Sequence, residues 1–331
     1  MTKLNPKNTA THFVKVYHGF GHAHNMQAFG HVFKQKIHYS TNAGDGFLQS
    51  VSQLMRLFFV QPLAGVRVRL TWENQQFESV TESDGFFRFE WQSENSVPAG
   101  WHRVTISSLD EEGKPVASGE GMVFIPHITQ YGIISDIDDT VMVSHSATVF
   151  KRLRELLTRN AFSRKVFADS ARLYNLLGLA QTTADTPNPF FYVSSSEWNL
   201  YDYLLQVFRH NKLPEGALLL NQVKRWFELW KTGKTKHEGK LLRIVRILEA
   251  FPNQQFILLG DNSQSDPAIY QSITEKYQGR IFAVYIRNVH PEKITVTSQI
   301  LNGIQQTGVH ALLFNSSLEA IEHVDKIGLS A

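Results

Sequence analysis

Aspartates follow the ends of two apolar runs, and this grouping is the strongest chemical signal in the sequence. The segment Asp136-Ile137-Asp138-Asp139-Thr140 follows one run, and Asp261 and Asp266 follow another. Carboxylates that are brought together repel one another unless a cation or a proton relieves them. The chain has no cysteine, and oxygen ligands favour a hard ion such as Mg²⁺, which shares its coordination with substrate phosphates. The pattern therefore predicts a phosphate-ester substrate and a Mg²⁺ site built from Asp136, Asp138, Asp261 and Asp266.

The first aspartate cluster suggests a division of roles. In an extended segment, residues two apart point to the same side, so Asp136 and Asp138 can face one substrate. We expect Asp136 to attack phosphorus as a nucleophile and Asp138 to act as acid and base. An acidic turn with helix-capping aspartates is the structural alternative for this cluster. Capping of a helix that begins at Pro267 would likewise explain Asp266.

Two residues could donate hydrogen bonds to phosphoryl oxygens. Ser194 follows the apolar run 190–193, and Lys240 begins a predicted helix ahead of the run 256–259. Ser194 with Glu197 also fits a capping box, and a helix N-terminus is itself an anion site. Most lysines lie on the surface, so an ordinary exposed position is the alternative for Lys240.

The second half of the chain alternates predicted strands and helices. This alternation predicts a parallel, doubly wound α/β sheet with helices on both faces. Ligands of such sheets bind outside the carboxyl ends of the strands, where Asp136, Ser194 and Asp261 all lie. The predicted strands are 131–135, 190–193, 256–259, 280–289 and 311–315, and the predicted helices are 149–157, 169–177, 197–207, 239–250 and one from Asp266.

The first half of the chain shows the pattern of strands. Short alternating runs at 65–72, 76–80, 86–91, 102–107 and 117–125 predict a small antiparallel β-sandwich, with only 46–57 weakly helical. We therefore expect a β domain over 1–128 and an α/β domain over 129–331. His18, His22 and His24 lie within seven residues, so a metal site is one interpretation, and ordinary turn and strand histidines are the favoured one.

The motifs of the second half resemble those of a known superfamily. Asp136-x-Asp138-x-Thr140, a serine that ends the next strand, a lysine before the last strand and Gly260-Asp261-x-x-x-x-Asp266 are similar to the haloacid dehalogenase superfamily. The resemblance implies that Asp136 is the nucleophile, Asp138 the acid and base, and Asp261 and Asp266 supports for Mg²⁺. It also implies phosphate binding by Ser194 and Lys240, to which we add Thr140 from the first motif.

A narrower resemblance covers roughly 131–289. The segments around Asp136 and Asp261, together with Tyr192-Val193-Ser194 and Ile286-Arg287, resemble the phosphatidate phosphatase family first described for a yeast actin-patch protein. Bacterial members of that family place a β-rich domain ahead of the phosphatase domain. The resemblance implies Mg²⁺-dependent cleavage of phosphatidate to diacylglycerol and phosphate. Asn262 and Ser265 depart from the family pattern, which makes the superfamily a firmer expectation than the lipid substrate.

One segment bears on contact with a membrane. Val223, Trp226, Phe227 and Trp230 recur at helical spacing among basic residues. Such a stripe could rest on an anionic membrane surface, form a cap over the site, or pack in its own domain, which is the favoured interpretation.

Composition limits the remaining classes. The 331 residues carry 33 basic and 30 acidic side chains, a net charge of +3, which gives no argument for nucleic acid. No run is long enough for a signal peptide or a membrane span. We therefore expect a cytoplasmic protein, with peripheral membrane contact left open.

Two other functions remain open. One is a phosphatase for a soluble ester or a phosphoprotein, and the other is a membrane- or partner-binding module with a vestigial phosphatase domain. Neither a Gly-x-Ser-x-Gly elbow nor a Walker-type loop occurs, which disfavours serine hydrolases and P-loop enzymes.

Overall fold

A computed structural model describes residues 12–36, 56–57, 59–127, 130–137, 140, 167–221 and 236–330. For residues 236–238 it describes the backbone alone. Several predictions lie outside the described residues. They are the helix at 149–157, most of the helix at 46–57, Asp138, and the stripe with Trp226, Phe227 and Trp230.

The second half forms a six-stranded sheet in the order β11-β10-β9-β12-β13-β14, and every pairing in it is parallel. Nearly all of its strand residues are buried, as expected for a sheet covered on both faces. The parallel α/β architecture is therefore confirmed. The strands are β9 (Gly132–Asp136), β10 (Phe190–Glu197), β11 (Gly216–Asn221), β12 (Phe256–Asp261), β13 (Ile281–Arg287) and β14 (His310–Phe314).

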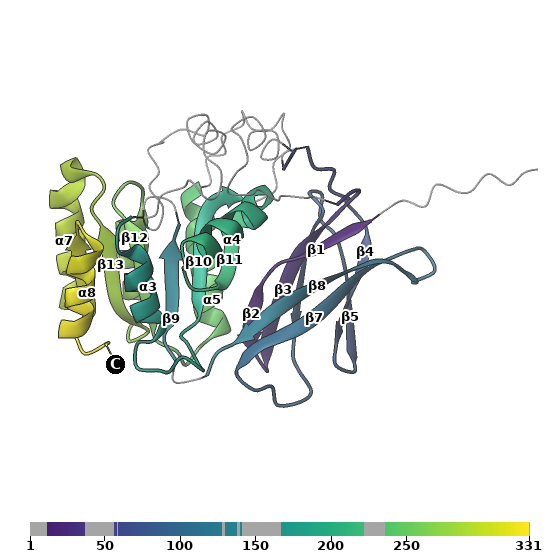
Figure 1. Cartoon of the computed structure of the whole chain (residues 1–331), viewed down its shortest axis with the longest axis horizontal. Helices are drawn as coiled ribbons and strands as arrows, with labels where there is room; N and C mark the ends of the chain where they lie inside the picture. The colour runs from purple at the N-terminus through teal and green to yellow at the C-terminus, as the bar shows by residue number, and fades with distance from the viewer. Residues whose placement is uncertain are drawn as a thin grey trace, which may run out of the picture.

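Helices follow the strands and pack on the sheet and on one another (Figure 1). Helix α5 packs on β10, α6 on β12 and α7, and α3 on α8. The helices are α3 (Ser170–Gly178), α4 (Tyr201–His210), α5 (Lys236–Ala250), α6 (Asp266–Lys276), α7 (Ile294–Gln306) and α8 (Ser317–Lys326), with 3₁₀ turns η1 (Trp198–Leu200) and η3 (Pro291–Lys293).

The structure differs from the sequence prediction at four places in this half. Strand β10 runs on to Glu197, where a helix was expected to begin, and β11, α7 and α8 were not predicted. Strand β11 is a short apolar run that periodicity cannot distinguish from buried helix, and it is recognised only by its pairing with β10.

The described residues of the first half form eight hydrogen-bonded strands, and β3 pairs with β1, β2 and β6. All pairings are antiparallel except that of β2 with β8, which is parallel. The predicted antiparallel pairing is therefore corrected at this one pair, and the sandwich arrangement stays a prediction. The strands are β1 (Phe13–Val16), β2 (Gly19–His22), β3 (Asn25–Phe33), β4 (Arg67–Trp72), β5 (Gln75–Val80), β6 (Phe86–Trp91), β7 (Gly100–Leu109) and β8 (Pro115–Ile125).

The two halves share a hydrophobic core. Tyr17, Phe20, Phe29 and Phe33 belong to the same buried cluster as the strands of the parallel sheet. The ring of Tyr17 stacks on Trp198 with centroids 4.2 Å apart. The β1–β8 region therefore packs against the β11 side of the parallel sheet (Figure 1), and the domain boundary near residue 128 stays a prediction.

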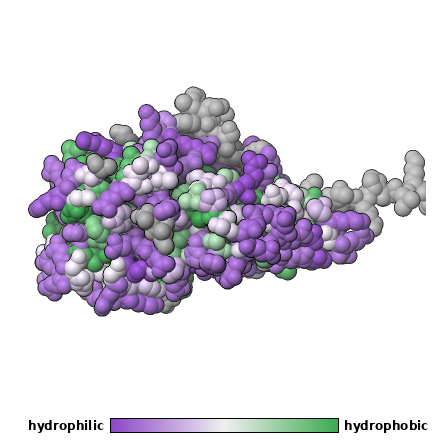
Figure 2. Space-filling model, turned by 90° about the horizontal axis from the view of Figure 1, so that it is seen from below, coloured by the Kyte–Doolittle hydropathy of each residue, from purple (hydrophilic) through white to green (hydrophobic). Residues whose placement is uncertain are grey.

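Hydrophilic residues predominate on the face of the molecule shown in Figure 2. No helix among the described residues is long and apolar enough to cross a membrane.

Candidate active site

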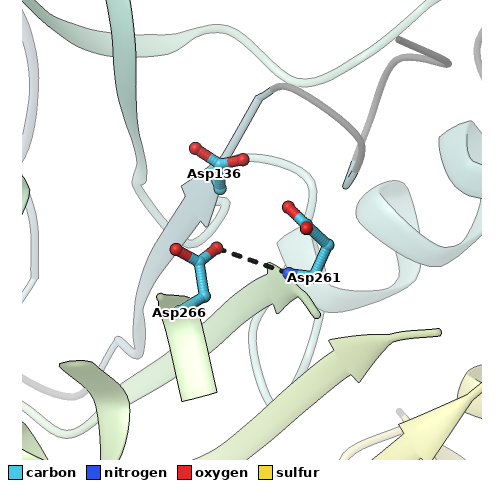
Figure 3. Close-up of side chains that lie close together, drawn as sticks. All are labelled: Asp136, Asp261 and Asp266. Atoms are coloured by element: carbon cyan, nitrogen blue, oxygen red, sulfur yellow. Dashed lines mark hydrogen bonds between the residues drawn. The ribbon is translucent and has the colours of Figure 1, made fainter. Parts of the chain in front are cut away.

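The parallel sheet brings the predicted carboxylates together. Strands β9 and β12 are neighbours, with Ser135 opposite Leu259, so Asp136 and Asp261 lie at adjacent carboxyl ends. Asp266 joins them from the first turn of α6. One carboxylate oxygen from each residue lies within 4.8 Å of the others, all three residues are buried, and the side chains face a common space (Figure 3). The predicted convergence of Asp136, Asp261 and Asp266 is therefore confirmed.

Asp266 has a role other than capping. The residue that caps α6 is Ser265, whose side chain makes no capping hydrogen bond, and Asp266 already belongs to the helix. One oxygen of Asp266, Oδ2, accepts a hydrogen bond from the backbone N–H of Asp261 at 3.3 Å (Figure 3). The capping alternative for Asp266 is therefore wrong, because its carboxylate turns back toward the end of β12.

Gly260 allows this close approach. A Cβ atom at residue 260 would lie 2.5 Å from Asp266 Oδ2 and 2.9 Å from the ring of Tyr270. Glycine is therefore the residue that fits between β12 and α6 without displacing the carboxylate.

Lys240 lies inside the carboxylate group. Its Nζ atom is 2.9 Å from Asp136 Oδ1 and also donates to Asp266 Oδ1. Burial opposes the charged form of Lys240, but the carboxylates of Asp136 and Asp266 outweigh it, so its pKa lies above the usual value. The surface alternative for Lys240 is therefore wrong, since the residue is buried and supplies a positive charge to the site.

Two hydrogen-bond donors hold the carboxylate of Asp261. Thr140 Oγ1 donates to Asp261 Oδ2 at 3.2 Å, and the backbone N–H of Ser263 donates to Oδ1 at 2.5 Å. Burial raises the pKa of Asp261, and the charge of Asp266 raises it further. Thr140 thus contacts a carboxylate, and its predicted role in phosphate binding stays a prediction.

Ser194 lies beside Asp136 across the sheet. Val193 is opposite Asp136, so Ser194 is the next residue beyond the strand pairing. It is buried, and its Oγ accepts a hydrogen bond from the N–H of Ser196. This turn-like contact replaces the predicted capping box, because β10 continues to Glu197. The position of Ser194 is compatible with its predicted contact to phosphate.

Two arginines near the site had no predicted role. Arg243 Nη2 donates to the carbonyl oxygen of Ser194 at 3.3 Å, and Arg287 Nε donates to the carbonyl oxygen of Thr140 at 3.0 Å. Burial lowers the pKa of each guanidinium to about 10. Arg243 follows Lys240 by three residues on one helix, and this spacing places both on the same face. The spacing could therefore have indicated from the sequence that Arg243 lies near the site.

The donor set fits a hard divalent cation. Three buried carboxylates face one another with one ammonium among them, and burial together with the charge of Asp266 raises the pKa of Asp261. Among the described residues this is the only group of three candidate ligands, so the histidines at 18–24 show no such cluster. Asp136, Asp261 and Asp266 are thus the residues that could hold the ion.

Residues 131–288 match the family model for the catalytic domain of phosphatidate phosphatase APP1. The chain is also 32% identical over 168 residues to phosphatidate phosphatase APP1 of Saccharomyces cerevisiae, which covers 49% of this chain and 27% of the yeast protein. An uncharacterized protein of Schizosaccharomyces pombe is 23% identical over 193 residues, or 55% of this chain and 30% of that protein. This chain therefore spans less than a third of the length of either relative. Over its second half the chain is therefore similar to the catalytic domain of a phosphatidate phosphatase.

Solved structures add no argument. A carbohydrate acetylesterase of Xanthomonas citri aligns over 88% of this chain and 72% of its own, at 9% identity and a TM-score of 0.26. So low a score indicates neither a common fold nor a common activity.

Proposed function

We propose that this chain is a Mg²⁺-dependent phosphatidate phosphatase of haloacid dehalogenase type that uses Asp136 as its nucleophile. The observation that carries the proposal is the position of Asp136. It lies at the end of a buried strand, beside Lys240 and two further carboxylates, within the segment that matches the phosphatidate phosphatase catalytic domain.

The reaction has two displacements. A carboxylate oxygen of Asp136 attacks phosphorus, the bond from phosphorus to the glycerol oxygen breaks, and that oxygen takes a proton from Asp138 to leave as diacylglycerol. Water then attacks the phosphorus of the aspartyl phosphate and gives a proton to Asp138, and the bond between phosphorus and the Asp136 oxygen breaks. Inorganic phosphate leaves, and both aspartates return to their starting states. The role of Asp138 rests on sequence, because it lies outside the described residues.

The other polar and charged groups position the nucleophile and stabilise the negative charge of the phosphate. Asp136, Asp261 and Asp266 would hold Mg²⁺, which when bound neutralises negative charge on the phosphoryl oxygens. Lys240 keeps a carboxylate oxygen of Asp136 in place through its 2.9 Å contact, and its ammonium attracts the dianionic phosphate. Ser194 can donate to a phosphoryl oxygen from the neighbouring strand. The burial of the site excludes water that would otherwise weaken these contacts.

Phosphate release tests the proposal. Phosphatidate, glycerol 3-phosphate, sugar phosphates and a phosphopeptide are compared with and without EDTA. We expect release from phosphatidate that requires Mg²⁺ and falls at least about 10³-fold in Asp136→Asn, as for loss of a nucleophile. Asp325→Asn, at an exposed aspartate of α8, is the matched control. Full turnover by Asp136→Asn would disprove the covalent mechanism, and release from soluble esters alone would disprove the lipid substrate.

Cytoplasmic location and peripheral membrane contact belong to the same proposal. The membrane contact rests on the expected lipid substrate and on the basic aromatic stripe at 223–230 predicted from the sequence.

A further inference from the structure

A hollow of about 310 Å³ lies between the β1–β8 region and the parallel sheet. Its lining comes from both halves of the chain: strands β2, β3 and β6, the end of β11, the 3₁₀ turn η1 and helix α5. The volume lies at the lower end of the range for small-molecule sites, so the hollow suits part of a ligand.

Aromatic side chains form one part of this lining. Phe20, Phe29 and Phe86 come from the β1–β8 region, and Trp198 comes from the parallel-sheet half. The Trp198 ring lies 5.6 Å from the ring of Phe29 and 6.3 Å from that of Phe86, centroid to centroid. Leu242 of α5 adds an aliphatic side chain that is 63% exposed. This side of the hollow favours an apolar ligand group.

Arginines form another part of the lining. Arg243 and Arg246 come from α5, and Arg88 comes from β6. Burial lowers the pKa of Arg246, and the charge of Arg88 lowers it further. Among the described residues, the buried Nε atom of Arg243 has no hydrogen-bond partner. Arg88 already pairs with Glu90, with 3.3 Å between Nε and Oε1, and Glu82 and Asp84 also line the hollow. Among the lining arginines of the described chain, Arg243 is therefore the one with a buried N–H left for a ligand oxygen.

Arg243 connects the hollow to the carboxylate site. It lies one helical turn after Lys240, whose Nζ contacts Asp136, and it donates to the carbonyl oxygen of Ser194 next to Asp136. The negative charge of Asp136 acts on this guanidinium. A ligand whose phosphate lies at Asp136 would therefore extend past Arg243 toward the aromatic side chains.

We propose that this hollow binds the acylglycerol part of the phosphate-ester substrate, so that the β1–β8 region forms half of the substrate site. This inference rests on the proposed function and adds to it the location of the lipid. Arg243 binds oxygens at the phosphate–glycerol end, while Trp198, Phe29, Phe86 and Leu242 contact the first part of an acyl chain. The remainder of the chains stays outside a volume of this size.

The test places a charge on the apolar side of the hollow. Leu242→Asp is compared with Val296→Asp, because Val296 lies on α7 away from the hollow and is 61% exposed. The full-length protein with Mg²⁺ is assayed on water-soluble dioctanoyl phosphatidate and on glycerol 3-phosphate, which has no acyl chain. We expect Leu242→Asp to lower kcat/KM for dioctanoyl phosphatidate about tenfold, mainly through KM, as for loss of the apolar contact between one leucine and an acyl chain. The rate with glycerol 3-phosphate and both rates of Val296→Asp should change less than about twofold.

A second measurement needs no change in the hollow. In the wild-type protein, KM should fall as the acyl chains lengthen from two to about eight carbons, because each methylene adds apolar contact. An equal effect of Leu242→Asp on both substrates, or no chain-length dependence of KM, would overturn the inference while leaving the proposed function intact. Failure of the wild-type protein to release phosphate from any phosphatidate would instead overturn the proposed function, and the inference with it.

Discussion

We expect the positive charge of Lys240 to stabilise the folded protein by offsetting the repulsion among three buried carboxylates. The variant Lys240→Met tests this directly. Methionine keeps most of the aliphatic stem and removes the ammonium that lies 2.9 Å from Asp136 Oδ1 and also contacts Asp266. Removing one partner of a buried ion pair costs about 3–5 kcal/mol, because the remaining charge is left uncompensated.

Protonation limits this cost. In the variant, one carboxyl can instead take up a proton. At pH 7, roughly three units above the ordinary aspartate pKa, protonation costs about 1.36 kcal/mol per unit, or about 4 kcal/mol in all. We therefore expect Lys240→Met to lower the free energy of unfolding by about 3–4 kcal/mol in EDTA. The corresponding fall in Tm is roughly 6–16 °C.

The pH dependence follows from the same argument. In the variant the folded state would bind a proton that the unfolded state releases, so the loss of stability shrinks as the pH falls from 7 toward the ordinary aspartate pKa. Mg²⁺ at the proposed site would bind only the folded state and should stabilise the variant more than the wild type, because no ammonium competes for the oxygens.

Urea unfolding at several pH values, with EDTA or with Mg²⁺, measures both effects. Lys326→Met, at an exposed lysine near the end of α8, controls for the loss of a lysine as such and should leave stability within about 0.5 kcal/mol. Equal stability of Lys240→Met and wild type in EDTA at neutral pH would refute the reasoning, since it would mean that the carboxylates need no compensating charge.

Three further predictions concern other parts of the fold. Gly260→Ala should lower the free energy of unfolding by about 1–3 kcal/mol and weaken Mg²⁺ binding in a calorimetric titration, because its Cβ would displace the Asp266 carboxylate. Gly303→Ala is the control, since a Cβ there meets nothing closer than 3.9 Å. Equal behaviour of the two variants would contradict the prediction. His31 is buried and its pKa is lowered to about 3, whereas the unfolded value is about 6.5, so its contribution to stability is complete above that value and is lost as the pH falls from about 6.5 toward 3. Between pH ~7.5 and ~5 this loss is about 2 kcal/mol, and urea midpoints that fall as much in His31→Gln as in wild type would count against it. Arg287→Lys should lower the free energy of unfolding by about 2–3 kcal/mol, because lysine cannot reproduce the contacts of the guanidinium with Thr140 and two serines. It should also weaken Mg²⁺ binding, since Thr140 in turn donates to Asp261. Unchanged urea and Mg²⁺ titrations would show that Arg287 does not support the site.

The sequence by itself located the carboxylates and the elements that carry them. Apolar runs that end in Asp136 and Asp261 were readable because strand burial and turn chemistry are local properties of the chain. Their placement at the carboxyl edge of one sheet then followed from the alternation of strands and helices. The pairing of β9 with β12, which makes the two ends neighbours, is known only from the structure. The short apolar run of β11 had no such local signature, since only its partner strand distinguishes it from a buried helix.

Tertiary structure decided how the charges meet. The return of Asp266 toward the end of β12, the insertion of Lys240 between carboxylates and the exposure of Arg243 to a hollow all depend on α5 and α6 packing against the sheet. The joining of Tyr17 and Phe29 to Trp198 likewise depends on contacts between distant parts of the chain. Such contacts are chosen by packing and charge compensation among all neighbours at once, and no local pattern in the sequence records that choice.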